Sequence, residues 1–147
     1  MIRKILVPVD GSEHSRTALD FACELSEKFG AELAVLHVVK DEAAERVVMV
    51  MGNAHVSLPA DPERVEAAGH AIIEAARERA ESHGRRLTSM TSVAGAPAKE
   101  ILAHAEDGAF DTIVLGSRGL SDLGGLLLGS VSHKVSHLAP CTCIVVR

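Results

Sequence analysis

The sequence predicts an α/β fold: a doubly wound parallel sheet of five strands with helices on both faces. Short runs of aliphatic and β-branched residues alternate with longer segments of helical periodicity, which is the pattern of repeated strand–helix–strand units. Most of these runs are apolar on both faces, as parallel strands between two helical layers must be. Because a length of 147 residues is typical of one domain, we assign residues 1–147 to a single unit.

The first part of the chain is expected to contain two buried strands joined by a helix. Residues 2–9 form an apolar run with the length of a strand. A helix should begin with Ser12 as its N-cap and end at Gly30. Residues 33–39 predict the second strand. Four apolar residues have the spacing of one face of the helix: Ala18, Ala22, Leu25 and Phe29.

The middle of the chain is the least regular part. We predict that residues 40–60 form a long loop with at most one helical turn. Its apolar patch, 47–51, could lie in the core or bind a partner, and we favour the core. A long helix should then begin with Asp61 as N-cap and end before Gly84.

The last part is expected to supply three strands and two helices. Residues 87–93 alternate between apolar and polar, which indicates a half-exposed strand near an edge of the sheet. Glycine and proline mark the boundaries of the other elements. These are a helix over 97–108, a strand over 111–115, a helix from Ser130 that ends before Pro140, and a strand over 142–146.

Composition excludes several classes of function. No apolar run approaches the roughly 18 residues that span a bilayer, so we expect no membrane insertion. The net charge is −5 and the basic residues are scattered, which argues against nucleic-acid binding. Three cysteines without secretory features predict free thiols and a cytoplasmic protein. Because Trp and Tyr are absent, any planar ligand would be held by aliphatic side chains and backbone groups.

A glycine-rich motif follows the fourth predicted strand. Its first part is Gly116-Ser117-Arg118-Gly119, and nine residues later the chain reads Gly129-Ser130 at the start of the last helix. Glycines let the backbone approach an anion closely, and a helix N-terminus offers amide donors and a favourable dipole. Ligands of open α/β sheets bind at the carboxyl ends of strands, where the winding direction reverses. The motif therefore predicts a phosphate site.

The spacing G-x2-G-x9-G-[S/T] resembles the ATP-binding signature of the ATP-binding branch of the universal stress protein family. The turn Pro8-Val9-Asp10-Gly11-Ser12, the pair His37-Val38 and the ending Ala139-Pro140-Cys141 also resemble that family. The resemblance covers residues 3–147. It implies a sheet of strand order 3-2-1-4-5, in which the winding direction of the chain reverses between strands one and four.

The resemblance also implies a ligand and a role for each part of the site. The ligand would be ATP with Mg²⁺: Asp10 would bind the ribose region, the backbone of Val38 would bind adenine, and the glycine motif would hold the phosphates. A homodimer is expected through the last strand, Thr142–Val146, where Thr142-Cys143 departs from the family's usual pair and leaves the packing of that strand open. The full set of expected binding residues is Pro8, Val9, Asp10, Val38, Gly116, Ser117, Arg118, Gly119, Gly129, Ser130, Val131 and Ser132.

Plainer interpretations remain beside these. The glycines could be turn and cap residues, Asp10 could only cap the first helix, and Arg118 could be a solvated charge. His133 and His137 are four residues apart but lack a third metal ligand with a recognisable spacing, so no metal site is expected. Cys141 and Cys143 are interpreted as packing residues.

Three functions compete for this chain. The leading one is a nucleotide-dependent regulatory module that acts through an unidentified protein partner. The second is an enzyme, either a slow ATPase or a nucleotide-dependent transferase. A phosphate-loop enzyme carries a lysine directly before its Ser or Thr, and Gly129 occupies that place here, so we expect no fast enzyme. The third is an interaction scaffold that has lost the nucleotide.

Overall fold

The computed structural model describes residues 1–40, 46–51, 54–59, 61–119 and 128–147, and for 46–51 and 54–59 it describes the backbone only. The strands are β1 (Lys4–Pro8), β2 (Glu32–Lys40), β3 (Arg46–Met51), β4 (Ala54–Pro59), β5 (Ser89–Gly95), β6 (Thr112–Gly116) and β7 (Thr142–Val146). The helices are α1 (Glu13–Phe29), α2 (Pro62–Ser82), α3 (Pro97–Asp107) and α4 (Ser130–Leu138).

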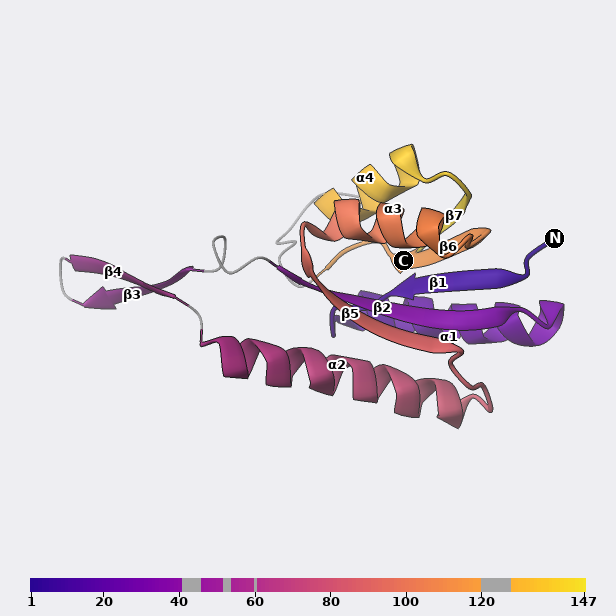
Figure 1. Cartoon of the computed structure of the whole chain (residues 1–147), viewed down its shortest axis with the longest axis horizontal. Coiled ribbons are helices and arrows are strands. Elements are labelled where there is room, and N and C mark those ends of the chain that lie inside the picture. The colour runs from indigo at the N-terminus through magenta and orange to yellow at the C-terminus, as the bar shows by residue number, and fades with distance from the viewer. Residues whose placement is uncertain (41–45, 52–53, 60, 120–127) are drawn as a thin grey trace.

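Five parallel strands form the main sheet, in the order β5-β2-β1-β6-β7. This arrangement confirms the predicted order 3-2-1-4-5. Helices α1 and α2 pack on one face, and α3 and α4 pack on the other (Figure 1). The chain leaves β1 first toward β2 and later returns beside β1 as β6, so the winding direction reverses at β1.

The core lies in two layers, one on each side of the sheet. Because successive side chains of a strand point to opposite faces, Ile5 and Val7 of β1 pack toward α1 and α2, and Leu6 packs toward α3 and α4. All three are fully buried. This is the physical reason why the strand is apolar at consecutive positions from Ile5 to Val7.

The helix ends lie where their capping residues predict them. The Ser12 hydroxyl accepts a hydrogen bond from Ser15 N–H, and the Asp61 carboxylate accepts one from Glu63 N–H. Gly30 and Gly84 have positive φ angles of 63° and 69° at the ends of α1 and α2. Phe29 is 48% exposed although it shares the apolar spacing of α1, because it lies in the last turn of that helix. Within the described residues, no helix is both long and apolar enough to cross a bilayer.

The prediction of a long loop over residues 40–60 was wrong in part. Strands β3 and β4 form an antiparallel hairpin that is a separate two-stranded sheet, with Met51 paired to Ala54 (Figure 1). The sequence between them is Gly52-Asn53, a dipeptide that favours tight hairpin turns, and that signal was overlooked. The environment of the apolar patch over 47–51 lies outside the described side chains.

Helices α1 and α2 are joined by a charged cluster around Asp20. Arg79 donates to both carboxylate oxygens of Asp20 at 2.6 Å, and His83 Nε2 lies 2.9 Å from one of them. The hydrogen bonds from Arg79 lower the pKa of the Asp20 carboxyl, because they favour its ionised form. At pH values above the unfolded-state pKa of Asp20, the cluster therefore stabilises the folded protein. This contribution is lost as the pH falls through the lower, folded-state pKa of Asp20.

We therefore expect Asp20→Asn to lower the free energy of unfolding by about 1 kcal/mol at neutral pH, as partly exposed bidentate pairs do. The difference from the parent should shrink toward zero as the pH is lowered below about 4, near the unfolded pKa of aspartate. Urea denaturation over a pH series measures it. Glu74→Gln, which removes an exposed charge paired with Arg77, is the matched control and should cost less. A cost for Asp20→Asn that does not depend on pH would contradict the ionic role.

Candidate functional site

The residues predicted to bind a ligand gather at one edge of the main sheet. Strand β1 pairs with both β2 and β6, so the carboxyl ends of these three strands are neighbours. Pro8, Val9 and Asp10 lie at the end of β1, Val38 lies near the end of β2, and the first half of the glycine motif directly follows β6. Helix α4 begins at the same edge, because the backbone N–H of Gly129 donates to the carbonyl of Ser117 at 2.6 Å.

The turn after β1 builds the start of α1. The Asp10 carboxylate accepts a hydrogen bond from Ser12 N–H at 2.9 Å, and Gly11 between them has a φ angle of +82° that favours glycine. The Ser15 hydroxyl donates to the carbonyl of Ser12 at 3.0 Å. Asp10 therefore stabilises the turn that leads into α1, whereas the helix cap itself is Ser12, and the half-buried side chain of Asp10 lies at the predicted edge.

Ser117 connects three elements at this edge. Its N–H donates to the carbonyl of Val146 in β7 at 2.7 Å, and its own carbonyl accepts from Gly129 N–H and from the Ser132 hydroxyl at 2.7 Å. Ser117 and Ser132 are almost fully buried. The Gly129 amide and the Ser132 hydroxyl, both in the predicted ligand set, are thus engaged within the protein, and they hold the start of α4 against the end of β6.

The N-terminus of α4 has no side-chain cap. Gly129 is its N-cap residue and has no side chain to accept from the first-turn amides. Among the described residues, the N–H groups of Ser130, Val131 and Ser132 have no hydrogen-bond acceptor. Ser130 is exposed and Val131 is half-buried. Three amide donors and the positive end of the helix dipole are therefore available to an anion.

Gly116 allows the end of β6 to pack closely against α1. A Cβ added to this residue would lie 2.6–2.8 Å from three atoms of His14, two of them the backbone carbonyl carbon and oxygen. The first turn of α1 therefore passes directly against the end of β6. His14 also places its Nδ1 3.5 Å from the hydroxyl of Ser117. Arg118 and Gly119 are half-buried, and the residues that follow, 120–127, lie outside the described part of the chain.

Sequence reasoning named His37 only as part of the family resemblance and gave its side chain no role at this edge. Its ring is buried on β2, and Nδ1 lies 2.8 Å from the carbonyl oxygen of Val9. Gly69 of α2 lies against the other side of the ring: an added Cβ would be 3.3 Å from its Cδ2 atom. A histidine within an apolar strand and a glycine in the middle of a helix were the two signals that could have identified this contact.

The histidine and cysteine pairs near the C-terminus show no reactive arrangement. The rings of His133 and His137 stack with centroids 5.5 Å apart, and the described residues contain no group of three or more side chains that could hold a metal ion. Burial raises the pKa of the Cys23 and Cys143 thiols to about 11 and also raises the pKa of Cys141. Protonated thiols that are buried at Cys23 and half-buried at Cys141 and Cys143 agree with a packing role.

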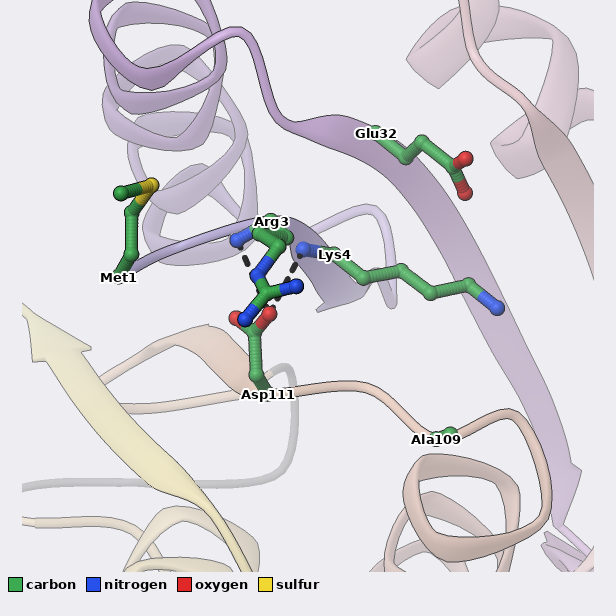
Figure 2. A pocket seen from close by; sticks show the side chains of 6 residues that line it. All are labelled: Met1, Arg3, Lys4, Glu32, Ala109 and Asp111. Carbon is green, nitrogen blue, oxygen red and sulfur yellow. Dashed lines mark hydrogen bonds between the residues drawn. The ribbon is translucent and has the colours of Figure 1, made fainter.

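A pocket at the opposite edge of the sheet contains none of the predicted ligand residues. It is lined by the start of β1 and of β2 together with Ala109 and Asp111 (Figure 2). The Asp111 carboxylate accepts from the N–H groups of Arg3 and Lys4 at 2.9 and 3.1 Å, and Lys4 Nζ donates to the carbonyl of Gly108. These contacts join the amino ends of β1 and β6, so the charged residues that line the pocket have a structural role.

Fold and site together define a doubly wound α/β protein with an uncapped helix N-terminus at its topological switch point. The chain belongs to the universal stress protein family, whose model matches residues 1–147. It is 40% identical to universal stress protein YxiE of Bacillus subtilis (strain 168), with all of both chains covered.

Solved structures share the fold over almost the whole chain. The universal stress protein UspA from Lactobacillus plantarum matches with a TM-score of 0.79 and 26% identity, covering 99% of this chain and 97% of that one. A universal stress protein solved in complex with cAMP matches with a TM-score of 0.73 and 24% identity, again covering 99% and 97%.

Proposed function

We propose that this chain is a cytoplasmic ATP-binding protein that acts as a nucleotide-dependent regulatory module in the response to stress. The phosphates bind at the first turn of α4 beside the loop after β6, the ribose binds near Asp10, and adenine contacts the backbone of Val38. Mg²⁺ accompanies the phosphates, because this ion is commonly bound through the phosphates of a substrate. The protein works as a homodimer paired through β7.

The uncapped N-terminus of α4 carries this proposal. A helix start whose amides lack acceptors is unfavourable unless water or a ligand satisfies them. Here the helix start is held in place by two hydrogen bonds to the carbonyl of Ser117, and it lies at the edge where ligands of such sheets bind. Amides arranged in this way, next to a half-buried glycine loop, fit a phosphate group. The universal stress protein that was solved in complex with cAMP shares the fold, which supports an adenine nucleotide as the ligand proposed for this chain.

Binding without rapid turnover follows from the charges of the site. Transfer of a phosphoryl group needs a fixed cation near the phosphates and a group that orients the attacking water. Position 129, where phosphate-loop enzymes carry lysine, is glycine, and Arg118 is the charged residue of the motif's first half. We therefore favour a regulatory role over the slow-ATPase and scaffold alternatives.

The test uses Ser130→Pro and Ser130→Ala. Proline is compatible with the first position of a helix, so Ser130→Pro removes one amide donor while α4 is kept, and Gly129 before it is already extended (φ −71°, ψ 165°). By calorimetric titration with ATP and Mg²⁺ the parent should bind, Ser130→Pro should bind at least about tenfold more weakly, and Ser130→Ala should stay close to the parent.

Two further results would decide against the proposal. If the parent shows no heat of binding at millimolar ATP, and denaturing the purified protein releases no nucleotide, the scaffold alternative is right. A steady-state phosphate release of about 1 per second that Ser130→Pro abolishes would instead make this chain an enzyme.

A further inference from the structure

The ladder between β1 and β2 is interrupted at its carboxyl end. The last paired residues are Pro8 and Leu36, so Val9 lies opposite His37. In a regular parallel ladder Val9 would donate to the carbonyl of Leu36 and accept from the N–H of Val38. The first bond is present at 2.9 Å. In place of the second, the imidazole Nδ1 of His37 lies 2.8 Å from the Val9 carbonyl oxygen.

The backbone of Val38 faces the place where β1 has ended. Along β2 the even-numbered residues direct their N–H and C=O toward β1, as the bond from Val9 to Leu36 shows, and the odd-numbered ones direct them toward β5, as the bond from Thr88 N–H to Leu33 shows. Val38 therefore presents one donor and one acceptor toward the predicted ligand site at the carboxyl ends of the strands. Among the described residues neither group has a partner, and Val38 is half-buried.

The imidazole is held firmly in its place. A carbonyl oxygen only accepts, so the ring nitrogen that contacts it, Nδ1, carries a proton. His37 is 9% exposed, and α2 packs on it through Gly69, where a Cβ would be 3.3 Å from the ring. A glycine in the middle of a helix is unfavourable in itself, so its presence here fits the need for space beside the ring.

We propose that His37 is a positioning residue of the nucleotide site: it takes the place of the Val38 amide at the Val9 carbonyl and thereby leaves Val38 N–H and C=O for the ligand base. This inference rests on the proposed nucleotide binding. A single N–H and C=O pair matches the edge of adenine, whose N1 accepts and whose amino group donates. Guanine has a donor and an acceptor in exchanged places, so with the ribose held near Asp10 it fits less well.

Two variants separate this role from simple packing. His37→Asn can present an amide N–H near the position of Nδ1, whereas His37→Leu fills space without a donor. We expect His37→Leu to bind ATP at least about tenfold more weakly and to lose most of its preference for ATP over GTP, while its affinity for inorganic tripolyphosphate stays within about twofold of the parent. His37→Asn should restore ATP affinity to within about threefold of the parent.

The outcomes distinguish this inference from the proposed function. If the parent binds neither ATP nor tripolyphosphate, the proposed function fails and this inference fails with it. If the parent binds ATP and a folded His37→Leu binds it equally well with unchanged base preference, only the role of His37 is wrong. Equal losses of ATP and tripolyphosphate affinity would likewise reduce His37 to a packing residue.

The parent protein supplies a measurement that does not depend on whether a variant folds. By ¹⁵N NMR, His37 should show a protonated Nδ1, and the Val38 amide should exchange with solvent faster than the paired amide of Leu36. Saturating ATP should shift and protect the Val38 amide, whereas tripolyphosphate should not. A Val38 amide that is protected without ligand, or that ATP leaves unchanged, would overturn the inference.

Discussion

Gly116→Ala is expected to lower the free energy of unfolding by about 2–3 kcal/mol, as overpacking of a dense core does. The added Cβ would lie 2.6 and 2.7 Å from the backbone carbonyl carbon and oxygen of His14, which cannot move aside as the end of a flexible side chain could. Either α1 or β6 must shift, and both contribute to the core. Chemical denaturation measures the change, and for a chain of this length the melting temperature should fall by roughly 5–10 °C.

Gly84→Asn is the matched control for the loss of a glycine. Gly84 has a φ of +69° with no atom within 4 Å of an added Cβ, and asparagine tolerates that conformation, so its cost should stay below about 1 kcal/mol. A Gly116→Ala protein as stable as the parent would show that α1 can move away freely. If the prediction holds, substitutions of Gly116 cannot serve as tests of phosphate binding, because any lost affinity would include the damage to the fold.

Val145→Pro is expected to convert the proposed homodimer to a monomer. Strand β7 lies at the end of the main sheet and pairs only with β6 among the described strands. Thr142 N–H donates to Asp111 and Val146 accepts from Ser117, so the even-numbered residues of β7 bond to β6 and the amide of Val145 faces the outer edge. Proline there removes an outward donor and keeps the ladder to β6, so it should block pairing with a second copy.

Light scattering decides this prediction. The parent should have twice the 15.5 kDa of one chain and Val145→Pro should have the mass of one chain, while Val145→Ala, which keeps the amide, should stay a dimer. If Val145→Pro is still a dimer, the interface must lie on another surface. If the parent is a monomer, the proposed homodimer is wrong. Deleting the strand would be a poorer test, because it also removes the Val146 carbonyl that accepts from Ser117 in the site.

Local signals in the sequence determined most of the elements. The caps Ser12 and Asp61 and the glycines after α1 and α2 mark helix ends that depend on one residue's side chain or φ angle, so they can be found without the tertiary structure. The hairpin β3–β4 was missed although its turn dipeptide is equally local. The order of the strands came from the family resemblance, because composition alone does not say which strands are neighbours.

The sequence by itself also determined that a ligand site should be sought at the carboxyl ends of the parallel strands, and the glycine motif after β6 marked one of the loops. Only the tertiary structure decided what each residue does there. Ser117 meets Ser132 fifteen positions along the chain, and Val9 meets His37 twenty-eight positions along it. Gly116 meets the backbone of His14 on another element altogether. Such contacts depend on strand register and on the close approach of packed elements, and the residues that make them carry no local mark of their partners.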